Sequence, residues 1–332
     1  MEIKTAEYAR CGHPDRVCDI IADSILDECL KQDPNTRSAI EVFGCHGIVY
    51  IGGELTTNAY VDIAKIVKDT YKEIGYKDNI GVQTNIVMQS PEIKSLADKG
   101  AGDSGIVTGY ATNETKEMLP LEVVLAKRIV ESIDRRMADF PDGGELLPDG
   151  KVQVTIKNGI ASDVVIAYQS KYEECDCLVE MRATEVLMNY KCFDKDKTKF
   201  RIIRFENGGF DADTGLTGRK NVLWYGPRIP IGGGSFAGKD GTKVDRSGAY
   251  LARAIAINEV KKGAKEALVE ISFVIGNPNP LYVKVNGKQK DINIRNINVS
   301  KITVKKIIDE FGLNECVFKK MSLGGHFGCG WF

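Results

Sequence analysis

The chain has few histidines and tryptophans, no C-x-x-C motif and almost no net charge. Among its 332 residues are three histidines and two tryptophans, and 45 lysines and arginines stand against 46 aspartates and glutamates, a formal net charge of −1. Three histidines exclude a His-rich metal centre. Near-neutral charge argues against nucleic-acid binding, which usually requires a basic surface. No apolar run reaches the length of a membrane span and the N-terminus has no signal-peptide core, so we expect no membrane partner.

Cysteine usage indicates the redox compartment. The nine cysteines are an odd number without metal-binding spacing. Such thiols are typical of reduced, mostly buried side chains, and we expect a cytoplasmic protein. Cys175 and Cys177 are too close together and too isolated to predict a zinc site. With 43% apolar and 27% charged residues, the chain has the composition of a globular protein, and its length predicts two or three domains.

The predicted elements repeat three times along the chain. A helix, two strand-like runs and a second helix recur, and the strand pairs begin near residues 38, 151 and 268, about 115 residues apart. The second pair is a hairpin around Asn158-Gly159, a strong turn signal. The pattern predicts an α+β fold of three similar domains, each with helices on one face of a small sheet. The predicted helices are 16–31, 57–74, 121–137, 173–190, 247–262 and 300–311, the predicted strands are 38–43, 47–55, 151–156, 161–169, 268–275 and 281–285, and the predicted domains are 1–98, 100–207 and 208–332.

The most unusual stretch is 208–247, which carries ten of the 34 glycines and reads GGFDADTGLTGRKNVLWYGPRIPIGGGSFAGKDGTKVDRS. Glycine lets a backbone approach a ligand closely and direct its N–H groups at it. The lysines and arginines supply cationic donors for phosphate, and the aspartates can hold a divalent metal against the same phosphates. The stretch predicts a polyphosphate and metal site. A solvated, glycine-rich linker is the alternative, which the packed character of 221–225 and 249–257 disfavours.

The segment GGSFAGKD is not a P-loop. Gly233, Gly238 and Lys239 match the P-loop spacing, but Asp240 follows where Mg²⁺ coordination requires Ser or Thr. Two prolines also interrupt the preceding segment, which therefore cannot form the central strand that a P-loop follows. The prediction that this segment binds phosphate still holds, but a P-loop fold is excluded.

Three shorter motifs precede this stretch. GHPD at 12–15 begins a helix, where His13 and Asp15 lie at an end that attracts anions, and the alternative is a plain helix start. Glu54 ends an apolar strand after two glycines, as a solvated strand end or as a ligand contact. The loop GAGDSG, with Asp103, follows a polar, lid-like segment, and it is either a turn or a loop that closes over a ligand.

Six motifs follow one another in a fixed order, namely GHPD, GGELTT, GAGDSG with GYATNET, DTGLTGRK, GGGSFAGKDGTKVDRS and the closing GHFG. From about residue 5 to the C-terminus the chain resembles S-adenosylmethionine synthetase (methionine adenosyltransferase). The resemblance implies three βαββαβ-type domains about a pseudo-threefold axis, and a homodimer with shared active sites or a homotetramer. It also implies the reaction. The thioether of L-methionine displaces tripolyphosphate from ATP, and the tripolyphosphate is then hydrolysed to phosphate and diphosphate.

The resemblance also implies roles for individual residues. Catalysis is assigned to His13, Asp213, Arg219 and Lys239. ATP binding is assigned to His13, Asp149, Lys151, Arg204, Phe205, Asp213, Arg219, Lys220, Ser235 and Lys239. Methionine binding is assigned to Glu54, Gln89, Asp103, Asp213 and Lys243, two Mg²⁺ per site to Asp15 and Asp245, and one K⁺ per subunit to Glu41. Because sulfur is already nucleophilic, the reaction requires alignment and neutralisation of the leaving polyphosphate instead of a general base.

The chain departs from the family pattern at several positions. Arg16 follows GHPD where the family has lysine, Ser104 replaces a glutamine, and Ile231 replaces a residue that is commonly histidine. None of these changes removes a charged group assigned to the phosphates, so we expect activity. The alternatives are a shortened, non-catalytic relative that binds ATP or serves as a partner subunit, and a protein that retains only tripolyphosphate hydrolysis.

Overall fold

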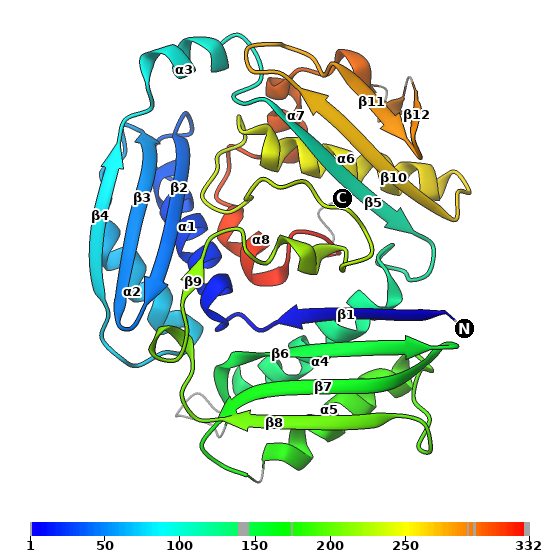
Figure 1. Ribbon diagram of the computed structural model, residues 1–332. Coiled ribbons are helices and arrows are strands. Elements are labelled where there is room, and N and C mark those ends of the chain that lie inside the picture. The colour runs from blue at the N-terminus through cyan, green and yellow to red at the C-terminus, as the bar shows by residue number, and fades with distance from the viewer. Residues whose placement is uncertain (1, 139–145, 174, 291, 295–296, 329–332) are drawn as a thin grey trace.

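The computed structural model describes residues 2–138, 146–173, 175–290, 292–294 and 297–328. Three four-stranded sheets surround the middle of the molecule, and in the view of Figure 1 their helices lie behind them. The strands are β1 (Ile3–Ala9), β2 (Arg37–Cys45), β3 (Ile48–Thr56), β4 (Gly81–Val87), β5 (Gly105–Thr112), β6 (Leu146–Lys157), β7 (Ile160–Ser170), β8 (Lys199–Phe205), β9 (Gly215–Leu216), β10 (Glu266–Phe273), β11 (Tyr282–Val285), β12 (Lys288–Gln289), β13 (Asn293–Ile294) and β14 (Ile297–Asn298). The helices are α1 (Pro14–Leu30), α2 (Ile63–Ile74), α3 (Pro91–Ala97), α4 (Leu121–Ala138), α5 (Cys175–Asn189), α6 (Val244–Lys261), α7 (Val304–Phe311) and α8 (Phe318–Gly324), with short 3₁₀ turns η1 (Gly209–Asp211), η2 (Asn221–Trp224) and η3 (Val299–Lys301).

The order of elements confirms the predicted α+β class with three similar units. The first unit runs β1-α1-β2-β3-α2-β4 and the second runs β5-α4-β6-β7-α5-β8. The third begins β9-α6-β10-β11 and continues to α7, and in the described part of this segment there is no parallel strand like β4 or β8. Each predicted helix overlaps an observed one. The second predicted helix begins later than expected, at Ile63, because Asp62 caps it by accepting a hydrogen bond from the Lys65 amide at 2.9 Å.

The first strand of each unit pairs with the sheet of the next unit. β1 pairs with β6 of the second unit, β5 pairs with β10 of the third, and β9 pairs with β2 of the first, all antiparallel. The exchange closes a ring in which no unit completes its sheet alone (Figure 1). Because each unit supplies an edge strand to a neighbour, we expect the three units to unfold together. The domain bounds 1–98, 100–207 and 208–332 stay a prediction.

Each sheet buries one face against its own helices. α1 packs on β2 and on α2, α4 packs on β1 and β6, and α6 packs on β5 and β10. In β2 the side chains of Ile40 and Val42 are fully buried towards α1, whereas Glu41 and Phe43 alternate onto the exposed face. Over the described residues, no helix is both long enough and apolar enough to cross a membrane.

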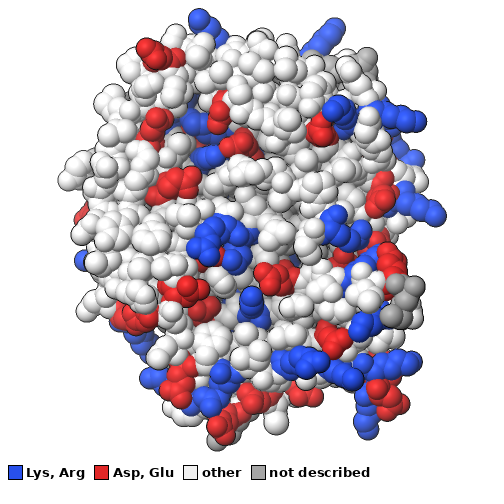
Figure 2. All heavy atoms as spheres, in the orientation of Figure 1, with Lys and Arg blue, Asp and Glu red and all other residues white. Residues whose placement is uncertain are grey.

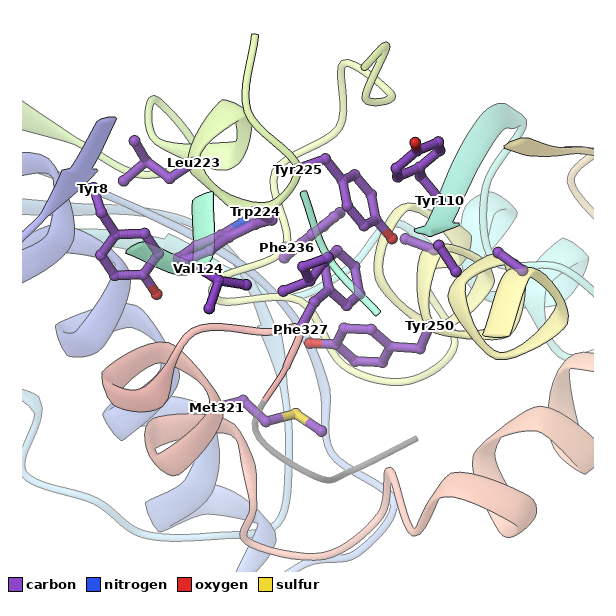
Figure 3. Close-up of a cluster of buried hydrophobic side chains, with 14 of the residues drawn as sticks. Tyr8, Tyr110, Val124, Leu223, Trp224, Tyr225, Phe236, Tyr250, Met321 and Phe327 are labelled. Atoms are coloured by element: carbon purple, nitrogen blue, oxygen red, sulfur yellow. The ribbon is translucent and has the colours of Figure 1, made fainter. Parts of the chain in front are cut away.

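An aromatic cluster fills the space where the three units meet (Figure 3). Tyr225 of the glycine-rich stretch stacks on Phe327, with ring centroids 4.7 Å apart, and Trp224 meets His326 edge to face at 4.9 Å. The Nδ1 atom of His326 lies 2.8 Å from the hydroxyl of Tyr250 on α6, and burial lowers the pKa of this histidine well below its usual value. The closing GHFG motif therefore anchors the glycine-rich stretch to the core, so this stretch is not a solvated linker.

Candidate active site

The GHPD motif forms the N-terminus of α1. Pro14 occupies the first turn, where its missing N–H costs nothing, and the Nδ1 atom of His13 accepts a hydrogen bond from the Asp15 amide at 3.2 Å. His13 is half-buried. Burial, followed by the positive charge of Lys220, lowers the pKa of its imidazole to about 4. His13 is therefore neutral near pH 7 and carries its proton on Nε2.

Asp15 joins GHPD to the DTGLTGRK motif. The Asp15 side chain is fully buried, and its Oδ1 accepts a hydrogen bond from the Leu216 amide at 2.9 Å. Lys220 Nζ lies 2.5 Å from Oδ2, and Arg219 Nε lies 3.2 Å from Oδ1. Two cations and one carboxylate are thus gathered at the start of α1. Figure 2, in the orientation of Figure 1, shows Lys and Arg side chains near the middle of the visible face of the molecule, with acidic side chains beside them.

Lys239 and Asp245 form a second charged pair. Lys239 Nζ lies 2.6 Å from Asp245 Oδ2, and Asp245 lies in the first turn of α6. The Asp245 carboxyl group packs directly on Gly234, where an added Cβ would lie 2.2 Å from Asp245 Cγ. The turn that carries Gly234 is also fixed by Asn221, whose Nδ2 donates to the Gly234 carbonyl oxygen at 2.7 Å. Glycine is therefore required at 234 because the carboxylate occupies the space of a side chain.

The turn before Arg219 touches the glycine-rich bend that packs on Asp245. A Cβ at Gly218 would lie 2.7 Å from Ser235 Cβ, so the turn before Arg219 packs on the turn after the three glycines. The buried Oγ atom of Ser235 has no hydrogen-bond partner among the described residues. Asp213 lies nearby in sequence and is exposed, with Oδ1 accepting from the Thr214 amide at 2.7 Å. The structure thus brings together the predicted residues of three motifs.

The residues predicted for methionine are spread over the first unit and its neighbours. Glu54 is half-buried near the end of β3, opposite Ala39 in the register with β2. Gln89 follows β4 and is 6% exposed, and its buried Oε1 has no hydrogen-bond partner in the described part of the chain. Asp103 accepts a hydrogen bond from the Ser104 amide at 2.7 Å. Within the described ranges, no hydrogen bond or ion pair joins Glu54, Gln89 or Asp103 to the charged pairs.

Lys243 and Glu41 each contact a different part of the glycine-rich stretch. Lys243 is the buried N-cap residue of α6, and its Nζ lies 3.5 Å from Asp240 Oδ2. Glu41 lies on the exposed face of β2, where its carboxylate accepts a hydrogen bond from the hydroxyl of Thr217. Thr217 precedes the turn that carries Arg219, so Glu41 contacts the DTGLTGRK motif directly.

Four of the residues predicted to bind ATP lie in the second unit. Asp149 is buried, and its carboxylate accepts hydrogen bonds from the amides of Gly150 at 2.6 Å and Gly209 at 2.8 Å. Burial raises the pKa of this carboxyl. Asp149 is therefore directed at the backbone that begins the glycine-rich stretch. Lys151 lies in the middle of β6, with its Nζ 3.4 Å from Glu7. Arg204 and Phe205 end β8, where Arg204 Nη2 lies 3.1 Å from Glu173 and Phe205 is half-buried.

Sequence reasoning missed a line of buried aspartates on α1. Asp19, Asp23 and Asp27 follow Asp15 at intervals of four residues, so all four share one helix face. Burial raises the pKa of Asp19 to about 7 and that of Asp27 to about 6. The fourfold spacing is visible in DRVCDIIADSILD. Like charges at this spacing destabilise an exposed helix, which indicates that each acid has a partner elsewhere.

The arrangement suits phosphate better than a metal held by protein alone. Among the described residues, no three His, Cys, Asp or Glu side chains gather as a metal site. Asp15 and Asp245 instead offer one carboxylate each, beside the cations Lys220 and Lys239. A cavity of about 560 Å³ lined by Arg37, Lys99 and Lys305 includes none of the residues predicted for the site in its lining.

Three family models match consecutive parts of the chain. The S-adenosylmethionine synthetase N-terminal domain matches residues 2–96, the central domain 98–204 and the C-terminal domain 207–332. This chain is 39%, 36% and 37% identical to proteins named S-adenosylmethionine synthase from Brachyspira hyodysenteriae, Staphylococcus epidermidis and Mycoplasmopsis pulmonis, respectively. Each match covers 98% of this chain and 92% or 93% of the relative. The chain belongs to the S-adenosylmethionine synthetase family.

Proposed function

We propose that this chain is a methionine adenosyltransferase, which makes S-adenosylmethionine from ATP and L-methionine and hydrolyses the tripolyphosphate to phosphate and diphosphate. The observation that carries the proposal is the pairing of Arg219 and Lys220 with Asp15, together with the pairing of Lys239 with Asp245. Three cations, each paired with one of two neighbouring carboxylates, match a leaving group that carries several negative charges. Family membership supplies the two substrates.

The reaction needs alignment and charge more than proton transfer. The methionine sulfur attacks C5′ of the ribose, the C5′–O bond breaks, and its electron pair leaves with the tripolyphosphate. Arg219, Lys220 and Lys239 bind phosphate oxygens in place of their present carboxylate partners. Because a preorganised donor is typically worth about 10²–10³ in turnover, each cation accounts for a large part of the rate.

His13 acts as a neutral hydrogen-bond donor. Its Nδ1 accepts from the Asp15 amide, so the Nε2–H is available for the leaving oxygen as negative charge develops there. The lowered pKa of about 4 keeps the imidazole ring uncharged near pH 7. His13 therefore polarises the leaving oxygen through a hydrogen bond and does not protonate it while the C5′–O bond breaks.

Asp15 and Asp245 fit the two Mg²⁺ expected for the family. Mg²⁺ prefers one or two carboxylates, with phosphate oxygens and water completing its shell, and each aspartate offers such a carboxylate beside a cation that phosphate can attract away. When bound, Mg²⁺ supplies further positive charge at the phosphate oxygens. Glu41 is proposed to hold K⁺ together with the neighbouring hydroxyl of Thr217.

The remaining assignments follow the family pattern. Asp149, Lys151, Arg204, Phe205 and Ser235 are proposed to bind ATP. The Oγ of Ser235, which has no hydrogen-bond partner among the described residues, supports a polar contact there. Glu54, Gln89, Asp103, Asp213 and Lys243 are proposed to bind L-methionine. The buried Oε1 of Gln89 has no hydrogen-bond partner in the part of the chain that the structure describes, and this supports that role, because a buried amide normally finds a partner.

We further propose a cytoplasmic homodimer with shared active sites, with a homotetramer as the larger alternative. Support comes from exposed apolar side chains on the outer faces of the strands, namely Phe43 on β2, Tyr50 on β3, Ile106 on β5 and Leu216 on β9. Apolar patches of this kind are typical of an interface.

The test is a turnover assay. Purified protein with ATP, L-methionine, Mg²⁺ and K⁺ should form S-adenosylmethionine and release phosphate. An Asp213→Ala, Lys239→Ala double variant serves as the control and should form none. Tripolyphosphate hydrolysis without S-adenosylmethionine, or product from the double variant, would contradict the proposal.

A further inference from the structure

Two aspartates of α1 hold the turns that carry the phosphate-binding cations. Asp19 Oδ1 accepts a hydrogen bond from the Gly218 amide at 2.8 Å, and Asp23 Oδ1 accepts one from the Gly238 amide at 2.9 Å. Gly218 directly precedes Arg219-Lys220, and Gly238 directly precedes the third cation, Lys239. The same contact therefore occurs twice, in each case one residue before a cation.

Both glycines need the conformation that these contacts fix. Gly218 and Gly238 have φ angles of 78° and 77°, which side-chain-bearing residues rarely adopt. A Cβ at Gly218 would lie 2.7 Å from Ser235 Cβ, and one at Gly238 would lie 2.1 Å from the Ile40 carbonyl oxygen. The backbone at Gly218 and Gly238 is thus in close contact with neighbouring segments, and the two aspartates fix the direction in which the amide groups of these glycines point.

Of the two aspartates, Asp19 is the better site for a substitution experiment, because it makes fewer other contacts. Asp23 also accepts hydrogen bonds from Arg246, at 2.6 and 2.7 Å, and from Ser322, so its loss would disturb the core. Asp19 is 3% exposed, and within the described residues the Gly218 amide is its one hydrogen-bond partner. Burying a carboxylate without a basic partner lowers the stability of the folded protein. The presence of Asp19 at this position therefore indicates a role other than stabilising the fold.

We propose that Asp19 is a positioning residue for the tripolyphosphate-binding cations Arg219 and Lys220. It acts from the helix whose first turn holds His13 and Asp15, and so it fixes both cations relative to these two groups. Without the acceptor, the Gly218 amide loses its partner, the turn relaxes, and the cations leave the position in which they neutralise the leaving group. Small displacements of this kind can lower rates by about 10²-fold. The inference rests on the proposed function.

The experiment compares three substitutions in the full-length protein. Asp19→Asn keeps a carbonyl acceptor for the Gly218 amide, whereas Asp19→Ala and Asp19→Leu, whose side chain is branched at the same carbon, remove it. Asp27→Ala is the matched control, because Asp27 lies two turns further along the same face and accepts hydrogen bonds from the amides of Phe318 and Lys319, which precede no assigned cation. The measurements are kcat and KM for S-adenosylmethionine formation and calorimetric binding of inorganic tripolyphosphate.

We expect Asp19→Ala and Asp19→Leu to lower kcat about 10- to 100-fold and to weaken tripolyphosphate binding, with KM for methionine within about threefold of the parent. Asp19→Asn should restore kcat to within about threefold. Asp27→Ala should lower the unfolding midpoint but not kcat.

Three results would overturn the inference. These are a folded Asp19→Ala or Asp19→Leu protein with the parent kcat, an Asp19→Asn protein as slow as Asp19→Ala, or an equal loss of kcat in Asp27→Ala. If the parent itself makes no S-adenosylmethionine, the proposed function fails. Tripolyphosphate binding by the same variants would then still test the positioning role of Asp19.

Discussion

The buried carboxyl of Asp19 makes a sharp prediction about stability and pH. Burial raises its pKa from 3.8 to about 7 in the folded protein. Between these values the folded state binds more protons than the unfolded state, so the free energy of unfolding falls as pH rises. At 1.36 kcal/mol per pKa unit, the whole shift is worth about 4 kcal/mol, of which about 3 kcal/mol falls between pH 5 and pH 8.

Asp19→Asn removes this titration and keeps the hydrogen bond to Gly218. Urea unfolding of the parent and the variant, at equal protein concentration and at pH 5 and 8, measures the effect. The variant should gain about 3 kcal/mol relative to the parent on going from pH 5 to pH 8. The other titrating acids, such as Asp27, cancel in the comparison. Parallel pH profiles for the two proteins would refute the assignment of the raised pKa to Asp19.

Three further predictions concern the site. Lys239→Met removes one cation that we propose binds phosphate, and it should lower S-adenosylmethionine formation about 10²–10³-fold. Lys197→Met, at an exposed lysine outside the candidate site, should not change the rate. Gly238→Ala places a Cβ 2.1 Å from the Ile40 carbonyl oxygen at a φ of 77°. The substitution should lower the free energy of unfolding in urea by at least about 1–2 kcal/mol and should also lower turnover. An unchanged kcat would contradict the role of this turn. Removal of divalent metal with EDTA should stop turnover and excess Mg²⁺ should restore it; turnover that persists in EDTA would exclude the proposed metal role.

Helices and central hairpins were predictable from the sequence because their signals are local. Helical periodicity marked α1, α4 and α6, and the turn at Asn158-Gly159 marked the hairpin of β6 and β7. The edge strands β1, β5 and β9 were missed. Their partners lie in another unit, and neither the pairing nor the exchange of strands leaves a local pattern in the sequence.

The charged residues of the candidate site were named from the sequence, whereas the groups that support them were not. The resemblance implied that Lys220 and Lys239 bind phosphate and that Asp15 holds Mg²⁺; these roles stay a prediction, and the structure places each of the three beside an opposite charge. The aspartates at 19 and 23 were visible only as part of an amphipathic helix, because their hydrogen bonds go to backbone amides about 200 residues away. Asp149 likewise accepts hydrogen bonds from the glycine-rich backbone, a contact that its sequence neighbours do not indicate.

A crystal structure with a non-hydrolysable ATP analogue, L-methionine and Mg²⁺ tests the central claim most directly. The account predicts the terminal nitrogens of Arg219, Lys220 and Lys239 within about 4 Å of phosphate oxygens, the distance of an ion pair. It also predicts that the methionine sulfur is aligned with C5′ and the leaving oxygen. Cations that stay paired with Asp15 and Asp245 while the triphosphate binds elsewhere would contradict it.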